Sequence, residues 1–120
     1  MPSAACPQLT EDPPTVAAIN GHAFGAGMMF AMGHDYRLQR KDRGYMCAIE
    51  VEIGVGIPPP EMELFRHAMP PNAFFETTMG AKRWGAKDSL ARGLIHGVSS
   101  AATLFDDALK FAENEARLAR

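Results

Sequence analysis

The stretch NGHAFGAG, residues 20–27, decides the fold because it joins a strand-forming run to a helix-forming run through small residues. Residues 15–19 are rich in β-favouring side chains and predict a buried strand that closes at Asn20 and Gly21. Residues 26–33 are apolar on all sides and predict a short buried helix. The small residues between them let a ligand approach the backbone.

Composition limits the classes of function. The chain has 120 residues, 47% of them hydrophobic, and a net charge of −2, so one modest domain is expected. Without a basic block, it lacks the charge pattern expected for binding nucleic acid or an anionic membrane. No apolar run approaches the roughly 20 residues that a membrane-inserted helix needs. Cys6 and Cys47 are too few for a disulfide framework or a metal site, which favours a reducing compartment.

The chain divides into a short leader and one folded region. Residues 1–13 are polar and proline-rich and predict a disordered leader. The remainder, residues 14–120, predicts an α/β fold with helices dominating its second half. Beyond the first strand and helix we expect a strand at 36–40, a loop with a short strand at 48–57, and helices at 60–67, 73–82, 86–92 and from 103 to the end. Glu61 and Glu63 suit the first turn of the helix that starts at Pro60.

The loop offers backbone amides to a developing negative charge. The first N–H groups of a helix lack partners within the helix and lie at the positive end of its dipole. Such amide groups could bind an enolate oxygen. The glycine spacing matches neither the dinucleotide fingerprint nor the phosphate loop, so the loop on its own favours a tight turn without a chemical role.

Three segments together resemble the crotonase, or enoyl-CoA hydratase/isomerase, superfamily. They are residues 14–35 with the glycine loop, residues 50–60, and residues 80–98 with the sequence GAKRWG and the later GLI. The resemblance implies that residues 14–120 are the C-terminal portion of such a domain, a partial ββα superhelix with a helical C-terminal region. It also implies that the amide of Ala26, beside Gly25, is one of two donors that hold the thioester oxygen. The other donor belongs to an earlier half of the domain, before the first residue of this chain.

The matched positions separate two reactions. Hydratases of the family carry one glutamate in the helix after the glycine loop and a second in a later loop; here these positions are Met29 and Glu50. Hydration requires one group to activate the water molecule and another to handle the proton. A single carboxylate is enough to shift a double bond. An apolar Met29 also keeps the acyl pocket dry. Glu52 is the rival base, because spacing alone does not decide between it and Glu50, and the match to the family favours Glu50.

We therefore expect an enoyl-CoA delta isomerase that converts 3-enoyl-CoA into trans-2-enoyl-CoA in fatty acid β-oxidation, with Glu50 as the acid/base. The alternatives are a hydratase or another crotonase-type acyl-CoA enzyme, and a catalytically inactive truncated subunit. No metal and no separate cofactor are expected, since coenzyme A is part of the substrate. The resemblance also implies a homo-oligomer, a trimer, or assembly with a full-length homologue. It implies a peroxisomal location, with the mitochondrion as the alternative, although no targeting signal is readable.

Overall fold

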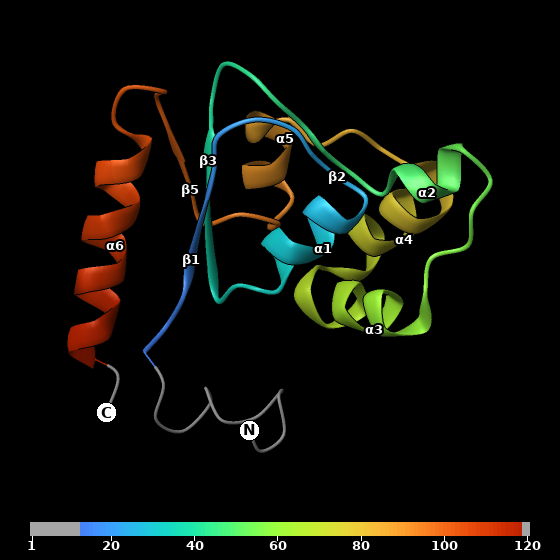
Figure 1. Cartoon of the computed structure of the whole chain (residues 1–120), viewed down its shortest axis with the longest axis horizontal. Helices are drawn as coiled ribbons and strands as arrows, with labels where there is room; N and C mark the ends of the chain where they lie inside the picture. Colours follow the sequence, from blue (N-terminus) through green and yellow to red (C-terminus); the bar gives the residue numbers. More distant parts are fainter. Residues whose placement is uncertain (1–12, 119–120) are drawn as a thin grey trace.

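The computed structural model describes residues 13–118 and has the expected α/β architecture (Figure 1). These residues form six helices and five strands, and the strands pair in parallel. All of the predicted leader except Pro13 lies outside the described residues, as do Cys6 and the last two residues of the chain. The elements in chain order are β1 (Val16–Ile19), β2 (Ala23–Phe24), α1 (Ala26–Met32), β3 (Tyr36–Arg40), β4 (Met46–Cys47), α2 (Ile49–Glu52), α3 (Pro59–Ala68), α4 (Pro71–Gly80), α5 (Ala86–Ala91), β5 (Gly97–Ser99) and α6 (Leu104–Leu118).

A three-stranded parallel sheet in the order β1-β3-β5 separates α6 from the other helices (Figure 1). The predicted strands at β1 and β3 are confirmed, with Ala18 opposite Leu38. The third strand, β5, was not predicted; it pairs with β3 so that Leu38 lies opposite Gly97. A Cβ at Gly97 would lie 2.7 Å from Leu38 Cδ2, so a side chain at this position would require Leu38 to shift. β5 has only three residues and depends on pairing with a distant segment, so its own sequence shows no strand pattern.

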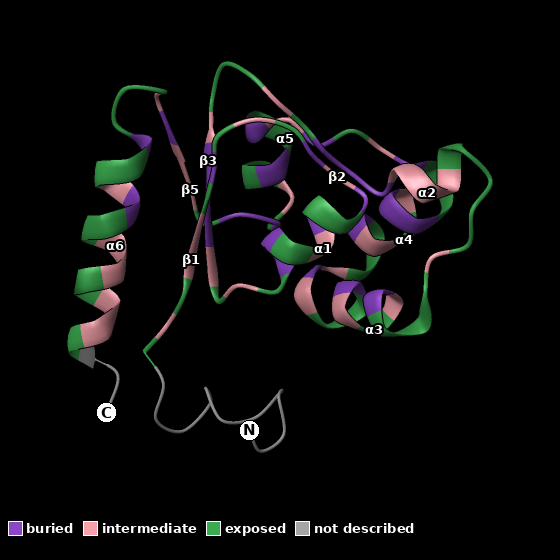
Figure 2. Ribbon diagram, viewed as in Figure 1, coloured by how far each residue is buried: buried purple, intermediate pink, exposed green. Residues whose placement is uncertain are grey.

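The core lies between the sheet and helices α1, α3 and α4, where Figure 2 shows the inward faces buried. Trp84, Phe65, Met28 and Met46 have no exposed surface and form its centre. A smaller cluster, formed by Leu38 of β3 with Leu104 and Ala108 of α6, lies between α6 and the sheet. Within residues 13–118, no helix combines the length and apolar character required to span a bilayer.

Two predictions about local structure are wrong. Helix α1 is not buried on all sides: Met28 and Met32 face the core, but Phe30 is 73% exposed. The segment 48–57 contains no strand and instead forms the single helical turn α2. The alternation of Ile49, Glu50 and Val51 resembles a strand, yet the parallel pairing ends at Cys47 and Val51 packs on the core from the turn.

Candidate active site

A second, two-stranded parallel sheet brings together the two segments that carry the site. Strand β2 pairs with β4, with Phe24 opposite Cys47. The amide of Gly25 continues the ladder by donating to the carbonyl oxygen of Cys47 at 2.9 Å. Because each strand is followed within two residues by a helix, parallel pairing sets the starts of α1 and α2 side by side. Residues 25 and 50, which are far apart in sequence, therefore become neighbours.

Gly25 allows the carboxyl group of Glu50 to lie against the backbone. Its φ of 60° and ψ of −121° belong to a region that residues with a Cβ rarely adopt. A Cβ at this position would lie 3.5 Å from Glu50 Oε2 and 3.4 Å from Ile49 Cγ2. The glycine thus provides the turn into α1, and a methyl group at this position would be in ordinary van der Waals contact with the carboxyl group.

Helix α2 places Glu50 and Glu52 in different surroundings. Residues two apart on a helix point in widely different directions. The Glu52 side chain is 50% exposed and accepts a hydrogen bond from Arg83 at 2.8 Å. Glu50 is half-buried, and its Oε1 is buried without a hydrogen-bond partner among the described residues. Only Glu50 combines burial with contact to the glycine loop.

The backbone beside this carboxyl group includes the amide of Ala26. Ala26 is the first residue of α1, and its N–H donates to no backbone oxygen among residues 13–118. Ala26 is itself exposed, so the amide is not covered by core side chains. Met29, one turn later, is half-buried and packs against the main core. The four residues expected at the site, Gly25, Ala26, Met29 and Glu50, therefore lie on two helix starts that the structure brings together.

Glu61 is a further carboxyl group at the site that the sequence did not identify as such. The sequence placed it only in the first turn of a helix, and the structure shows that it is 3% exposed. Burial, the negative charge of the nearby Glu50 and a hydrogen bond with the Glu50 side chain raise the pKa of Glu61 to about 7. An acidic residue in the first turn of a helix interacts favourably with the helix dipole whether it is buried or exposed. The local sequence therefore does not indicate that this face of α3 packs inward.

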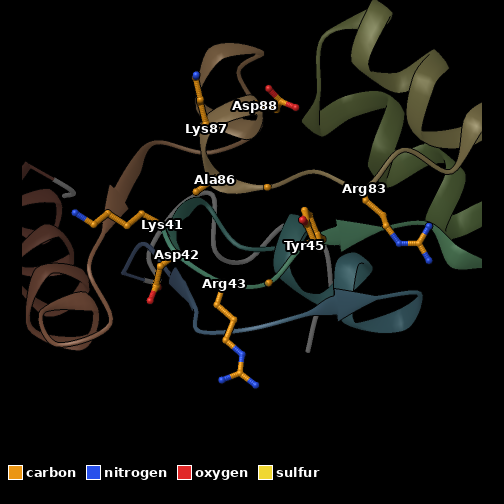
Figure 3. Close-up of a pocket in the computed structure, with 10 residues that line it drawn as sticks. Lys41, Asp42, Arg43, Tyr45, Arg83, Ala86, Lys87 and Asp88 are labelled. Carbon is orange, nitrogen blue, oxygen red and sulfur yellow. The ribbon is translucent and has the colours of Figure 1, made fainter.

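A basic pocket of about 320 Å³ lies apart from these residues, between the turn at 41–45 and the start of α5 (Figure 3). Figure 3 shows the side chains of Lys41, Arg43 and Lys87 pointing away from one another, not toward a common centre. Arg83, which also lines the pocket, is already bound to Glu52. Cations that diverge into solvent do not make a preorganised anion site, so we assign the pocket no chemical role.

Comparison with known proteins gives consistent matches. The family model described as enoyl-CoA hydratase/isomerase matches residues 8–119. Enoyl-CoA delta isomerase 1, peroxisomal, of Arabidopsis thaliana is 34% identical over 102 residues, which are 83% of this chain and 42% of that protein. Carnitinyl-CoA dehydratase of Shigella flexneri is 33% identical over 104 residues, 85% of this chain and 39% of that protein.

A short segment matches more strongly, and solved structures share the fold. Enoyl-CoA delta isomerase 3 of Arabidopsis thaliana is 56% identical over 45 residues, 38% of this chain and 19% of that protein. The crystal structure of an enoyl-CoA hydratase from Mycobacterium marinum superposes with a TM-score of 0.81 at 29% identity, covering 86% of this chain and 45% of that one. The chain thus spans less than half the length of the relatives that it matches.

Proposed function

The chain belongs to the enoyl-CoA hydratase/isomerase family, and from this premise we propose that it is an enoyl-CoA delta isomerase with Glu50 as its acid/base. The reaction moves the double bond of a 3-enoyl-CoA to give trans-2-enoyl-CoA, a step of fatty acid β-oxidation. One observation carries the proposal: the half-buried Glu50 carboxyl group lies against Gly25, next to the amide of Ala26.

The chemistry needs a base and a donor to the thioester oxygen. Glu50 removes a proton from C2, and the electron pair of that C–H bond moves into the dienolate, whose charge gathers on the thioester oxygen. The N–H of Ala26 donates a hydrogen bond to this oxygen and stabilises the charge as it develops. Glu50 then returns a proton to C4, and the double bond ends between C2 and C3. One carboxyl group is sufficient, because one proton is removed from C2 and one is returned to C4.

Met29 supports isomerisation over hydration. A thioether at this position neither activates a water molecule nor donates a proton, and its side chain packs on the apolar core. Helix α1 itself, residues 26–32, contributes no ionisable side chain to the site. A drier pocket also strengthens the electrostatic interactions within it.

A hydratase or dehydratase is the second candidate, and Glu61 is the observation that favours it. A carboxyl group with a pKa of about 7 is partly protonated at neutral pH and can act as an acid beside a carboxylate base. The name of the carnitinyl-CoA dehydratase relative points in the same direction. Both candidates take an acyl-CoA, and neither requires a separate cofactor.

Assembly and location are part of the same proposal. The chain spans less than half of each relative named above, and the family resemblance implies a second donor to the thioester oxygen besides Ala26. Phe105 and Leu109 on α6 are 72% and 48% exposed, which supports assembly into a trimer or with a full-length homologue through this helix. A subunit that assembles without turnover is the non-enzymatic alternative. The word peroxisomal in the names of two Arabidopsis relatives supports a peroxisomal location over a mitochondrial one.

The two candidate reactions are separated by their products. The purified chain is incubated with 3-hexenoyl-CoA and, separately, with trans-2-hexenoyl-CoA, and the products are identified by chromatography. Formation of trans-2-hexenoyl-CoA from the first substrate, without 3-hydroxyhexanoyl-CoA from the second, supports the isomerase. The opposite pattern supports the hydratase. Co-purification with a full-length homologue and no product from either substrate supports the non-enzymatic subunit.

A further inference from the structure

Glu50 and Glu61 form a carboxyl pair that lies between α2 and α3. Glu61 is 3% exposed and Glu50 is half-buried. Each retains one buried oxygen, Glu61 Oε2 and Glu50 Oε1, that accepts no hydrogen bond from the described residues. The charge of Glu50 and a hydrogen bond with its side chain are among the causes that raise the pKa of Glu61, so the two carboxyl groups lie close together.

Two ionised carboxylates cannot satisfy this arrangement. A carboxylate only accepts hydrogen bonds, so a pair without a proton contains no donor and places like charges together in a poorly solvated site. One proton removes both problems, because the protonated group donates to the ionised group. Burial and the charge of Glu50 raise the pKa of Glu61 to about 7, which agrees with Glu61 holding the proton.

The charged groups on the neighbouring elements do not provide another partner. Helix α1, which packs on α3, has no ionisable side chain. Glu52 on α2 is paired with Arg83, and Glu76 on α4 is paired with Arg92. On α3 itself Glu63, Arg66 and His67 are exposed. Within residues 13–118, no lysine, arginine or histidine forms an ion pair with Glu50 or Glu61.

We infer that Glu50 and Glu61 hold a single proton between them, with Glu61 as the protonated donor that positions the ionised Glu50 carboxylate against Gly25. The proton sharing stands on the structure alone, and its role in turnover rests on the proposed function. When Glu50 takes the C2 proton, the pair holds two protons and no charge. When one of them goes to C4, the pair returns to one proton and one charge. Glu61 is a positioning residue, because it acts on the substrate through Glu50.

The test is a direct titration of the carboxyl groups in the full 120-residue chain, labelled with ¹³C-glutamate and followed by NMR. It requires no substrate and no turnover, so its failure is distinct from failure of the proposed function. Sequential assignment identifies each carboxyl carbon, and backbone amide spectra report whether each variant is folded. The proteins are the wild type, Glu50→Gln, Glu61→Gln and the exposed control Glu63→Gln.

In the wild type we expect the Glu61 carboxyl carbon to titrate near pH 7, two or more pH units above an ordinary glutamate. Glu50→Gln removes the charge beside Glu61, so its midpoint should fall, whereas Glu63→Gln should leave it unchanged. Glu61→Gln should abolish the titration near pH 7. The inference is overturned if Glu61 titrates with the exposed glutamates in the folded wild type, a result that needs no variant. It is also overturned if folded Glu50→Gln leaves the Glu61 midpoint in place.

Discussion

Glu50 Oε2 would lie 3.5 Å from a Cβ at residue 25, and position 25 is a glycine with a φ of 60°. Backbone conformation and contact with the base therefore both depend on one residue. Gly54 also has a positive φ, 81°, but a Cβ at that position would have no neighbour within 4 Å. A substitution at Gly54 therefore strains the backbone without touching Glu50. The two glycines together separate conformational strain from contact with Glu50.

Gly25→Ala should reduce both stability and isomerase activity. We expect a loss of about 1–3 kcal/mol in the free energy of unfolding, because alanine must adopt an unfavourable backbone conformation. We also expect at least about a tenfold fall in rate, because strain at residue 25 shifts the backbone that Glu50 contacts and that leads into the N–H of Ala26. Gly54→Ala should lose stability through its own backbone strain and keep its activity per folded molecule. Urea unfolding and rate assays on both variants check this; an equal loss of rate in the two would contradict the role of the contact.

Glu61→Gln should remove a pH-dependent loss of stability. The pKa of Glu61 rises from 4.5 in the unfolded chain to about 7 in the folded one. The folded state therefore holds this proton more tightly, and the resulting stabilisation is present below about pH 4.5 and is lost as the pH rises through 7. With each pKa unit worth about 1.4 kcal/mol, the loss is about 3 kcal/mol. Unfolding at pH 4.5 and pH 8 should show this loss in the wild type and in Glu63→Gln, but not in Glu61→Gln. A wild type and a Glu61→Gln chain with parallel pH profiles would be the contrary outcome.

Thr77→Val should destabilise the core around Trp84. The buried indole Nε1 donates to Thr77 Oγ1 at 2.9 Å, and Trp84 has no exposed surface. Valine preserves shape but leaves the N–H without its acceptor, at a cost of about 1–3 kcal/mol. Thr78→Val is the matched control, because the hydroxyl of Thr78 donates only to Phe74 within its own helix. Fluorescence of the single tryptophan follows both unfolding curves; a larger loss in Thr78→Val would be inconsistent with this account.

The sequence predicted the elements whose evidence is local. β1, β3 and α5 carry their own apolar pattern and boundary residues, and they appear where expected. β5 depends on pairing with β3, and α2 depends on where the β2–β4 ladder ends, so neither is determined by its own residues. These are contacts between distant segments, which periodicity does not report.

The site was predicted in part for the same reason. Resemblance to a family identified Glu50, Gly25, Ala26 and Met29, and the structure brings their segments together. Glu61 was missed because an acid in the first turn of a helix is normally a solvated partner of the dipole. Its burial follows from the packing of α3 against α1, and its altered pKa follows from that burial and from the charge of Glu50 beside it. Neither effect is visible from position 61 alone.

The most direct measurement is conversion of 3-hexenoyl-CoA to trans-2-hexenoyl-CoA by the wild type, Glu50→Gln and Glu52→Gln. Glutamine keeps the shape of the side chain and cannot accept the C2 proton, so Glu50→Gln should lower the rate about 10²- to 10⁴-fold. Glu52→Gln loses only its exposed pair with Arg83 and should remain within a few-fold of the wild type. Conversion by the wild type with near-complete loss in Glu50→Gln is the result that we predict. Equal rates in the wild type and Glu50→Gln would contradict the assignment of Glu50 as the acid/base, and no conversion by the wild type would contradict isomerase activity of this chain.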